Sequence, residues 1–110
     1  MRVTAQKLVA AHLAGKSKTV GNSSVEVNHD GSVVYRLHGN AIVDIGPQGR
    51  VEVSLAGWPT PTTRSRVNDI LSGLGLEHRV GQEKHRQYLY HRGLVLTDID
   101  ARSWYGAGSL

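Results

Sequence analysis

Turn-forming residues divide residues 25–55 into short runs in which apolar and polar residues alternate. The turns are Asp30-Gly31, Gly39-Asn40 and Gly46-Pro47-Gln48-Gly49. Asp-Gly between alternating runs is typical of a tight hairpin, because glycine supplies the positive φ that such a turn requires. Successive hairpins at this spacing predict an antiparallel meander of about four strands. The strands are expected at residues 25–27, 32–37, 41–45 and 51–55.

Two segments have the composition and spacing of short helices. Residues 4–13 begin with a threonine cap, contain good helix formers and are followed by Gly15. A second helix is predicted to begin at Thr60-Pro61, because threonine is a favoured N-cap and proline is favoured at the first helical position. The apolar residues of this helix share one face, by which it is expected to pack. They are Val67, Ile70, Leu71 and Leu74.

The remaining segments complete the predicted fold. Residues 79–82 and 87–90 flank a charged turn and predict another hairpin, to which residues 94–96 add an edge strand. Residues 16–22 are polar and are expected to form a loop, and residues 101–110 a tail that is flexible or docks on a partner. The predicted class is α+β, an antiparallel β-sheet meander with two short helices, in a single domain over residues 1–110.

Composition limits the partners and the compartment. Hydrophobic residues make up 39% of the 110 residues and cysteine is absent, which excludes disulfides and cysteine-ligated metals. The net charge of +4 and the pI near 9.8 favour anionic partners. The chain has neither a signal-peptide pattern nor the ~20 apolar residues of a membrane helix, so we expect a cytoplasmic protein without membrane contact. A chain this short builds a small core, which favours a homo-oligomer.

Two segments of the chain resemble a known group of proteins. The run Tyr35-Arg36-Leu37-His38-Gly39-Asn40 is followed, after a strand, by Gly57-Trp58-Pro59-Thr60-Pro61-Thr62-Thr63-Arg64-Ser65-Arg66-Val67-Asn68. These segments resemble small phage and prophage proteins with an LHGN segment followed by a GW-T-TTR-R-N signature. The resemblance covers residues from about Val20 to Tyr90 and implies a viral protein inside the host cell. It carries over the positions of Arg36, His38, Asn40 and Asn68 without a role.

The start of the second helix is suited to bind an anion. Free N–H groups at the positive end of the helix dipole and the hydroxyls of Thr62 and Thr63 favour phosphate. The guanidinium groups of Arg64 and Arg66 would add charge, and arginine in a first turn is otherwise unfavourable for the dipole. Plain capping with solvated arginines is the alternative. Trp58 would either stack on a nucleotide base or pack beside the cap.

The sequence indicates no metal, cofactor or standard catalytic motif. The six histidines fit no metal-ligand spacing, so surface positions are expected for them. The patterns GxGxxG, GxxxxGK[ST] and GxSxG do not occur. His38, Asn40 and Arg64 would supply a hydrolytic group only if the fold brought them together. Binding without catalysis is therefore favoured over an enzyme.

We expect a phage-type accessory protein that binds an anionic nucleotide-class ligand, with sequestration of a host-defence signalling nucleotide as the most specific form. One alternative is a DNA- or RNA-binding accessory protein, in which Arg79, Lys84, Arg86 and Arg92 interleave with Tyr88 and Tyr90. The other is a module that binds a host protein. The candidate ligand-binding residues are Arg36, His38, Asn40, Trp58, Thr60, Thr62, Thr63, Arg64, Arg66 and Asn68.

Overall fold

The computed structural model describes residues 2–110, which form two helices and nine strands. It confirms the predicted α+β class with antiparallel sheets. The helices are α1 (Val3–Leu13) and α2 (Pro61–Gly73). The strands are β1 (Lys18–Val20), β2 (Ser23–Val27), β3 (Val33–Leu37), β4 (Asn40–Ile45), β5 (Arg50–Val53), β6 (His78–Glu83), β7 (Arg86–His91), β8 (Leu94–Ile99) and β9 (Tyr105–Ser109).

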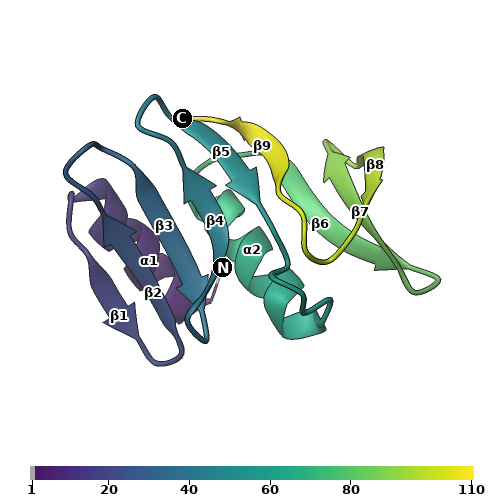
Figure 1. The fold of residues 1–110 in the computed structure, drawn as a ribbon, viewed down its shortest axis with the longest axis horizontal. Helices are drawn as coiled ribbons and strands as arrows, with labels where there is room; N and C mark the ends of the chain where they lie inside the picture. The colour runs from purple at the N-terminus through teal and green to yellow at the C-terminus, as the bar shows by residue number, and fades with distance from the viewer. Residues whose placement is uncertain (1) are drawn as a thin grey trace.

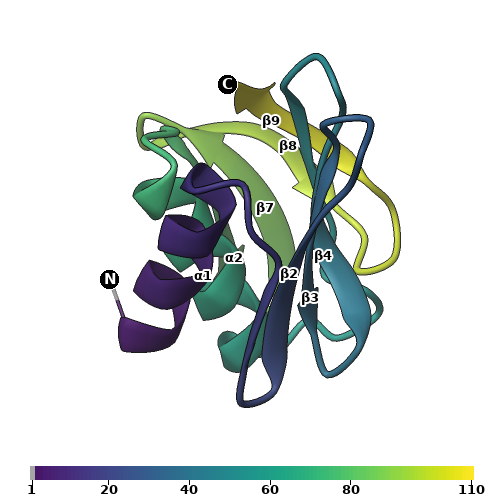
Figure 2. The ribbon, with the colours of Figure 1, turned by 90° about the vertical axis from the view of Figure 1, so that its left-hand side faces the viewer.

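The strands form two antiparallel sheets. The larger sheet has six strands in the order β1-β2-β3-β4-β5-β9, and the smaller has the order β6-β7-β8. Figure 1 shows the larger sheet in front of the helices and the smaller sheet at the right-hand end of the molecule. Figure 2 shows α1 and α2 together on one side of the larger sheet. The predicted meander from β2 to β5 is therefore present, and the two helices cover one of its faces.

The core lies between the helices and this covered face. In β3, Val33, Tyr35 and Leu37 are buried, whereas Val34 and Arg36 are partly exposed. This alternation is expected where a strand has one covered face, because successive side chains point to opposite sides of the sheet. Helix α2 packs on the same face by the predicted apolar stripe. Its fully buried members are Val67, Ile70 and Leu71.

Two strands lie in segments where the sequence predicted none. The loop expected at residues 16–22 contains β1, so that prediction is wrong at residues 18–20, which pair with β2. The segment 101–110, considered as a tail, contains β9, which pairs with β5. Strand β1 has only three residues, two of them exposed, and β9 is rich in glycine. Neither strand has an alternating pattern of its own, so both depend on the strand that each one pairs with.

Two turns bring separate parts of the chain to the same end of the larger sheet. His38 and Gly39 both have positive φ, 52° and 81°, and form a two-residue turn between β3 and β4. After β5 the chain reverses at Ala56 and Gly57, where φ is 55° and 86°. The Gly57 N–H donates to the Ala101 carbonyl at 2.6 Å, which ties this reversal to the β8–β9 loop. These turns position the candidate site.

Candidate functional site

A pocket of about 550 Å³ lies between the β3–β4 turn, the loop after β5 and the start of α2. We call it the Trp58 pocket. It brings together six of the ten predicted ligand-binding residues from segments far apart in the sequence. The six are His38, Asn40, Trp58, Thr60, Thr62 and Thr63. The other four, which do not line it, are Arg36, Arg64, Arg66 and Asn68.

Trp58 contributes an exposed aromatic ring to this pocket. Its side chain is 61% exposed, although the neighbouring Leu55 is buried. The Trp58 backbone is held on both sides: its N–H donates to the Leu55 carbonyl and its carbonyl accepts from the Thr60 N–H, both at 2.8 Å. The ring is therefore held by a fixed backbone but is open to solvent. Trp58 is therefore not a core residue.

The start of α2 is capped as predicted. Thr60 is the N-cap, its Oγ1 accepts from the Thr63 N–H at 3.3 Å, and Pro61 is the first helical residue. In the first turn of α2, Pro61 has no N–H group and the Thr63 N–H is bonded to the cap. Within the described chain, the Thr62 N–H is therefore the one backbone donor of this turn that has no partner. The helix end thus offers one backbone donor and hydroxyl groups, which is fewer donors than the sequence predicted.

Arg64 joins the start of α2 to the β6–β7 hairpin. Its Nη1 donates at 3.0 Å to three oxygens: the Pro59 carbonyl, Gln82 Oε1 and Gln87 Oε1. These acceptors lie outside the Trp58 pocket, and each uses part of the guanidinium donor capacity. The position of Arg64 therefore indicates a link between two elements more than a phosphate ligand.

Arg66 is a buried anchor of α2. Its side chain is only 9% exposed and donates to the Ser23 hydroxyl in β2. The cost of removing a guanidinium from water lowers the pKa of Arg66, and the nearby Asp69 carboxylate partly offsets this effect. The solvated position that one alternative gave Arg66 is therefore not found in the structure. A ligand in the Trp58 pocket would not reach this group without rearrangement.

Asn68 and Arg36 hold the framework around the pocket. Asn68 forms two hydrogen bonds of 2.8 Å with Val80 in β6: its Nδ2 donates to the carbonyl and its Oδ1 accepts from the N–H. Arg36 donates to Glu26 at 2.6 Å and to the Gly39 carbonyl at 3.3 Å. Since Gly39 lies between the lining residues His38 and Asn40, Arg36 supports the turn that carries them.

The sequence prediction missed the apolar residues that line the pocket and one cation, Arg102, which lies beside the Trp58 loop but does not line the pocket. The Arg102 side chain lies against Gly57, where an added Cβ would meet its Cγ and Cζ at 3.9 Å. None of the described carboxylates lies within 4 Å of the Arg102 guanidinium. The β8–β9 loop alone brings Arg102 here, so no local pattern could have found it. The apolar lining residues are Leu37, Ile42, Leu55 and Ala56.

The hairpin considered as a nucleic-acid surface uses part of its basic charge internally. Arg79 donates to two carbonyl groups of its own segment, and Arg92 pairs with Glu77. Tyr88 and Tyr90 contact each other edge to face, with ring centroids 6.2 Å apart, and both are partly exposed. Two basic residues of the hairpin remain exposed without such contacts in the described chain: Lys84 in its turn and Arg86 at the start of β7.

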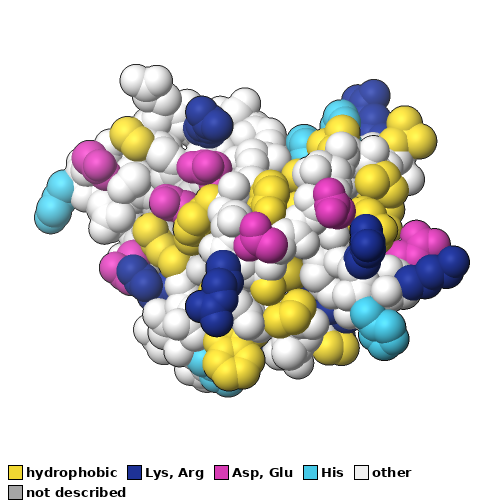
Figure 3. Space-filling model, turned by 45° about the vertical axis from the view of Figure 1, so that its right-hand side comes forward, with side chains coloured by type: hydrophobic (Ala, Val, Ile, Leu, Met, Phe, Trp, Pro, Cys, Tyr) yellow, Lys and Arg dark blue, Asp and Glu magenta, His cyan; other side chains and the backbone are white. Residues whose placement is uncertain are grey.

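Strand β8 is an exposed apolar edge. Leu94, Val95 and Leu96 are 73%, 53% and 53% exposed, and β8 pairs with β7 on one side only. Figure 3 shows hydrophobic side chains gathered on the end of the molecule that carries the smaller sheet. An unpaired edge with exposed apolar side chains is able to add another strand. This surface is separate from the Trp58 pocket, whose lining comes from other elements.

No helix within residues 2–110 is long and apolar enough to cross a bilayer. The described chain also lacks a group of three histidine or acidic side chains placed to hold a metal ion. His78 and His91 stack with ring centroids 4.4 Å apart, and burial together with the neighbouring His91 lowers the pKa of His78. This pair lies on the smaller sheet, outside the pocket.

Comparison with known proteins gives one family. The family described as Kyanoviridae Gp96 protein matches residues 1–106. The matched range contains every residue that lines the Trp58 pocket. No curated protein and no solved structure gives a significant match.

Proposed function

We propose that this chain, which belongs to the Kyanoviridae Gp96 protein family and is a small phage protein, binds a nucleotide-class ligand in the Trp58 pocket without catalysis. The family match confirms the predicted relation to small phage proteins, while the LHGN segment and the GW-T-TTR-R-N signature as markers stay predictions. The observation that carries the proposal is the exposed Trp58 ring beside a pocket lined by imidazole, amide and hydroxyl groups.

The pocket suits a flat heteroaromatic ring. An accessible aromatic side chain stacks on a nucleobase with about 1–3 kcal/mol, and Trp58 is held in an exposed position before any ligand arrives. The Asn40 amide offers both donors and an acceptor, and the hydroxyls of Thr60 and Thr62 add more. The volume of about 550 Å³ falls within the usual range of small-ligand pockets, roughly 300–1,000 Å³.

The phosphate of such a ligand would meet few cations. Arg102, beside the Trp58 loop, and the free Thr62 N–H at the positive end of α2 are the favourable groups. Arg64 and Arg66 are engaged elsewhere. We therefore expect the base to supply more of the affinity than the phosphate, and the affinity to fall only modestly with salt.

The proposal is binding without reaction, in which the His38 imidazole contacts the ligand and does not transfer a proton. None of the described residues that line the pocket is a carboxylate, and none is a lysine or arginine that would stabilise a developing charge. In the proposal the phage protein withholds a nucleotide from the host cytoplasm, with a host-defence signal as the most specific case. That deeper step rests on the phage family and on binding without turnover.

Calorimetric titration with a panel of linear and cyclic nucleotides tests the proposal. At least one should bind saturably, and native mass spectrometry should show it intact in the complex. Trp58→Ala should weaken binding about 5- to 150-fold, which corresponds to the loss of about 1–3 kcal/mol of stacking. The matched control is Trp104→Ala, the other tryptophan, which does not line the pocket.

A second variant distinguishes the contribution of the phosphate to binding from that of the base. Arg102→Gln should weaken the nucleotide but leave the corresponding nucleoside unchanged, because only the nucleotide carries a phosphate for the guanidinium. No binding across the panel would overturn the proposal, as would equal losses in the Trp58 and Trp104 variants. A ligand recovered as a cleaved product would show that the chain is an enzyme.

A further inference from the structure

A second concave surface lies between α1 and β1, away from the residues that the function above requires. It is a groove of about 660 Å³ lined by eight residues of α1, the connecting loop and β1. We call it the α1–β1 groove. Three of its lining residues are lysines: Lys7, Lys16 and Lys18. The others are Ala10, Ala11, Ser17, Thr19 and Val20.

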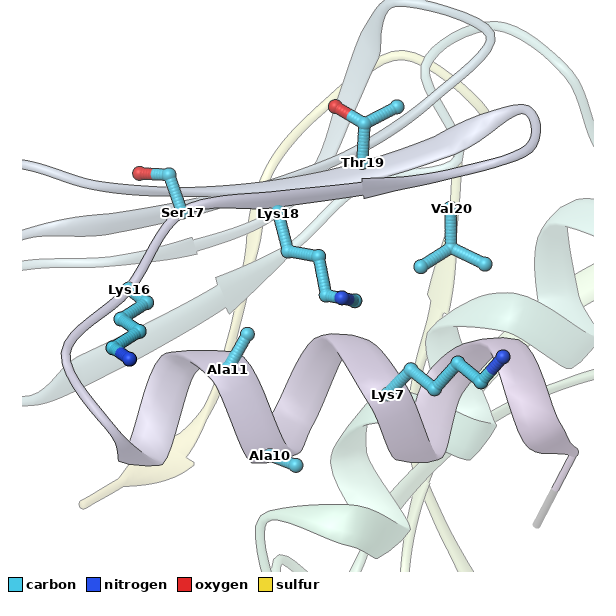
Figure 4. Close-up of a pocket in the computed structure, with 8 residues that line it drawn as sticks. All are labelled: Lys7, Ala10, Ala11, Lys16, Ser17, Lys18, Thr19 and Val20. Carbon is cyan, nitrogen blue, oxygen red and sulfur yellow. The ribbon is translucent and has the colours of Figure 1, made fainter.

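The three lysines come from three different parts of the structure: α1, the loop after it and β1. Figure 4 shows Lys18 extending from β1 toward α1, Lys7 on the helix itself, and Lys16 on the loop where α1 ends. Ala11 points from α1 toward β1, and its small side chain leaves the helix surface between Lys7 and Lys16 open. A ligand could therefore approach the backbone closely and meet an ammonium group on either side.

The positive charge of the groove is not neutralised within the protein. None of the three lysines lies within 4 Å of a carboxylate in the described chain. The first acidic residue of the sequence is Glu26, and it already pairs with Arg36. Three ammonium groups around one groove repel each other, so an anion there would remove an unfavourable interaction.

Structural roles account for part of this arrangement only. A lysine on an edge strand such as β1 hinders edge-to-edge pairing, and a lysine after α1 suits the negative end of the helix dipole. Those reasons apply to Lys18 and Lys16. Neither applies to Lys7, which lies in the middle of α1. The convergence of all three on one groove remains to be explained.

The length of the groove favours an anion longer than a single phosphate. Helix α1 rises about 9 Å between Lys7 and Leu13, at about 1.5 Å per residue, and Lys16 lies beyond that end. One phosphate would not contact both ends, whereas several linked phosphates would. The groove has no aromatic side chain to stack on a base. We propose that the α1–β1 groove binds a run of linked phosphates, the backbone of a nucleic-acid strand, without sequence preference.

Fluorescence anisotropy of a short labelled strand of thymidines tests this site. We expect binding whose affinity falls steeply between about 50 and 200 mM salt, as counterions are released. The variant with Lys7→Gln, Lys16→Gln and Lys18→Gln should bind more than about tenfold more weakly. Its slope of log affinity against log salt should fall by about 2, from about 0.7 for each lost phosphate contact on a single strand.

The matched control removes the same charge elsewhere. The variant with Arg50→Gln, Lys84→Gln and Arg86→Gln loses three positive charges at exposed positions outside the groove, and two of them lie on the hairpin that is the alternative nucleic-acid surface. If the strand binds in the groove and not on that hairpin, this variant should keep the wild-type slope. Circular dichroism should confirm that both variants are folded. Unchanged binding in the groove variant, equal losses in both variants, or no strand binding by the wild type would each overturn the assignment.

Two further experiments are needed. A competition experiment identifies the source of the phosphates, and the Trp58→Ala variant shows whether this site is independent of the Trp58 pocket. Inorganic tripolyphosphate that displaces the strand at matched phosphate concentration would assign the site to free polyphosphate; displacement only at large excess would assign it to nucleic acid. Trp58→Ala should leave strand binding unchanged. Failure of nucleotide binding in the pocket would therefore not affect this result, and the reverse also holds.

Discussion

At the scale of single residues, the Tyr35 hydroxyl is a polar group inside the core. Tyr35 is completely buried in β3, and its hydroxyl shares a hydrogen bond of 2.7 Å with His12 Nδ1 in α1. Tyr35→Phe leaves the imidazole without this partner and should lower the free energy of unfolding by about 1–2 kcal/mol. Urea unfolding measures the change. An unaltered midpoint would show that water replaces the hydroxyl at no cost.

The partial burial of His12 makes stability depend on pH. Burial lowers the pKa of His12 from its usual value near 6.5, so the unfolded chain binds the proton more tightly. The stability that comes from keeping His12 neutral is fully present above about pH 6.5, and it is lost as the pH falls through the lower pKa of the folded state. His12→Gln should therefore lose less stability than the wild type on acidification.

Local patterns predicted where helix α2 begins but not which residues its arginines contact. The cap at Thr60 and the position of Trp58 beside it follow from neighbouring residues, and the structure confirms the cap. The partner of Arg66 is Ser23, which lies 43 residues away, and that of Arg64 includes Gln87, 23 residues away. Such contacts depend on how the elements pack, and no spacing in the sequence specifies them.

At the scale of elements, Asn68 connects α2 to the smaller sheet. Its two hydrogen bonds satisfy both backbone groups of Val80 at 2.8 Å. Asn68→Ala should lower the free energy of unfolding by about 2–3 kcal/mol, because both groups lose their partner. Asn68→Asp is the matched control: it still accepts from the Val80 N–H but cannot donate to the carbonyl, so it should fall between. Equal stability of all three proteins would contradict this role.

The β8–β9 loop, which carries Arg102, is organised by Asp100. The hydrogen bond from the Ser103 hydroxyl and the N–H groups of Arg102 and Ser103 lower the pKa of Asp100 to about 2. Its stabilising effect is present above its usual value of 3.8 and is lost as the pH falls through about 2. Asp100→Ala should therefore unfold at lower urea than the wild type at neutral pH, and the difference should shrink in acid.

The exposed Asp98 provides the control for that experiment. Asp98→Ala removes the same charge from β8 without affecting the loop contacts, so its unfolding midpoint should stay close to that of the wild type. A difference between wild type and Asp100→Ala that stays constant down to pH 2 would show that the carboxylate is not the cause.

The predicted elements are those with a repeating pattern and a clear turn or cap. The hairpins from β2 to β5 and helix α2 meet that condition. Helix α1 was predicted from its helix formers and from Gly15, but the threonine cap predicted for it is wrong, because its N-cap is Arg2 and Thr4 lies within the helix. Strands β1 and β9 do not meet the condition, because β1 is a three-residue polar edge and β9 reads Tyr-Gly-Ala-Gly-Ser with only Ala107 buried. Each forms because a neighbouring strand offers unpaired backbone groups, and that information is not local.

At the scale of the whole molecule, the free edge of β8 is a surface through which the predicted homo-oligomer could form. Its residues 94–96 are apolar and exposed, which favours pairing with a strand of a second copy. The only charged side chain of β8 is Asp98. Two copies paired antiparallel about Leu96 would not set one Asp98 against the other. Light scattering should therefore give twice the 12.0 kDa mass of the chain. Val95→Lys should give the monomer, because a lysine opposes edge pairing.

The opposite edge of the molecule supplies the control for that prediction. Thr19→Lys places a lysine on β1, an edge strand of the larger sheet, and should leave the dimer intact. A monomeric wild type at high concentration, or a dimer that survives Val95→Lys, would contradict pairing through β8.

The central claim, that the Trp58 pocket binds a nucleotide-class ligand, is tested most directly by nuclear magnetic resonance. The chain has two tryptophans, so a ¹⁵N-labelled sample gives two indole N–H signals, which Trp104→Ala assigns. During titration with the nucleotide panel, the Trp58 signal should shift in a saturable way while that of Trp104 stays in place. A Trp58 signal that does not move with any nucleotide would contradict the claim.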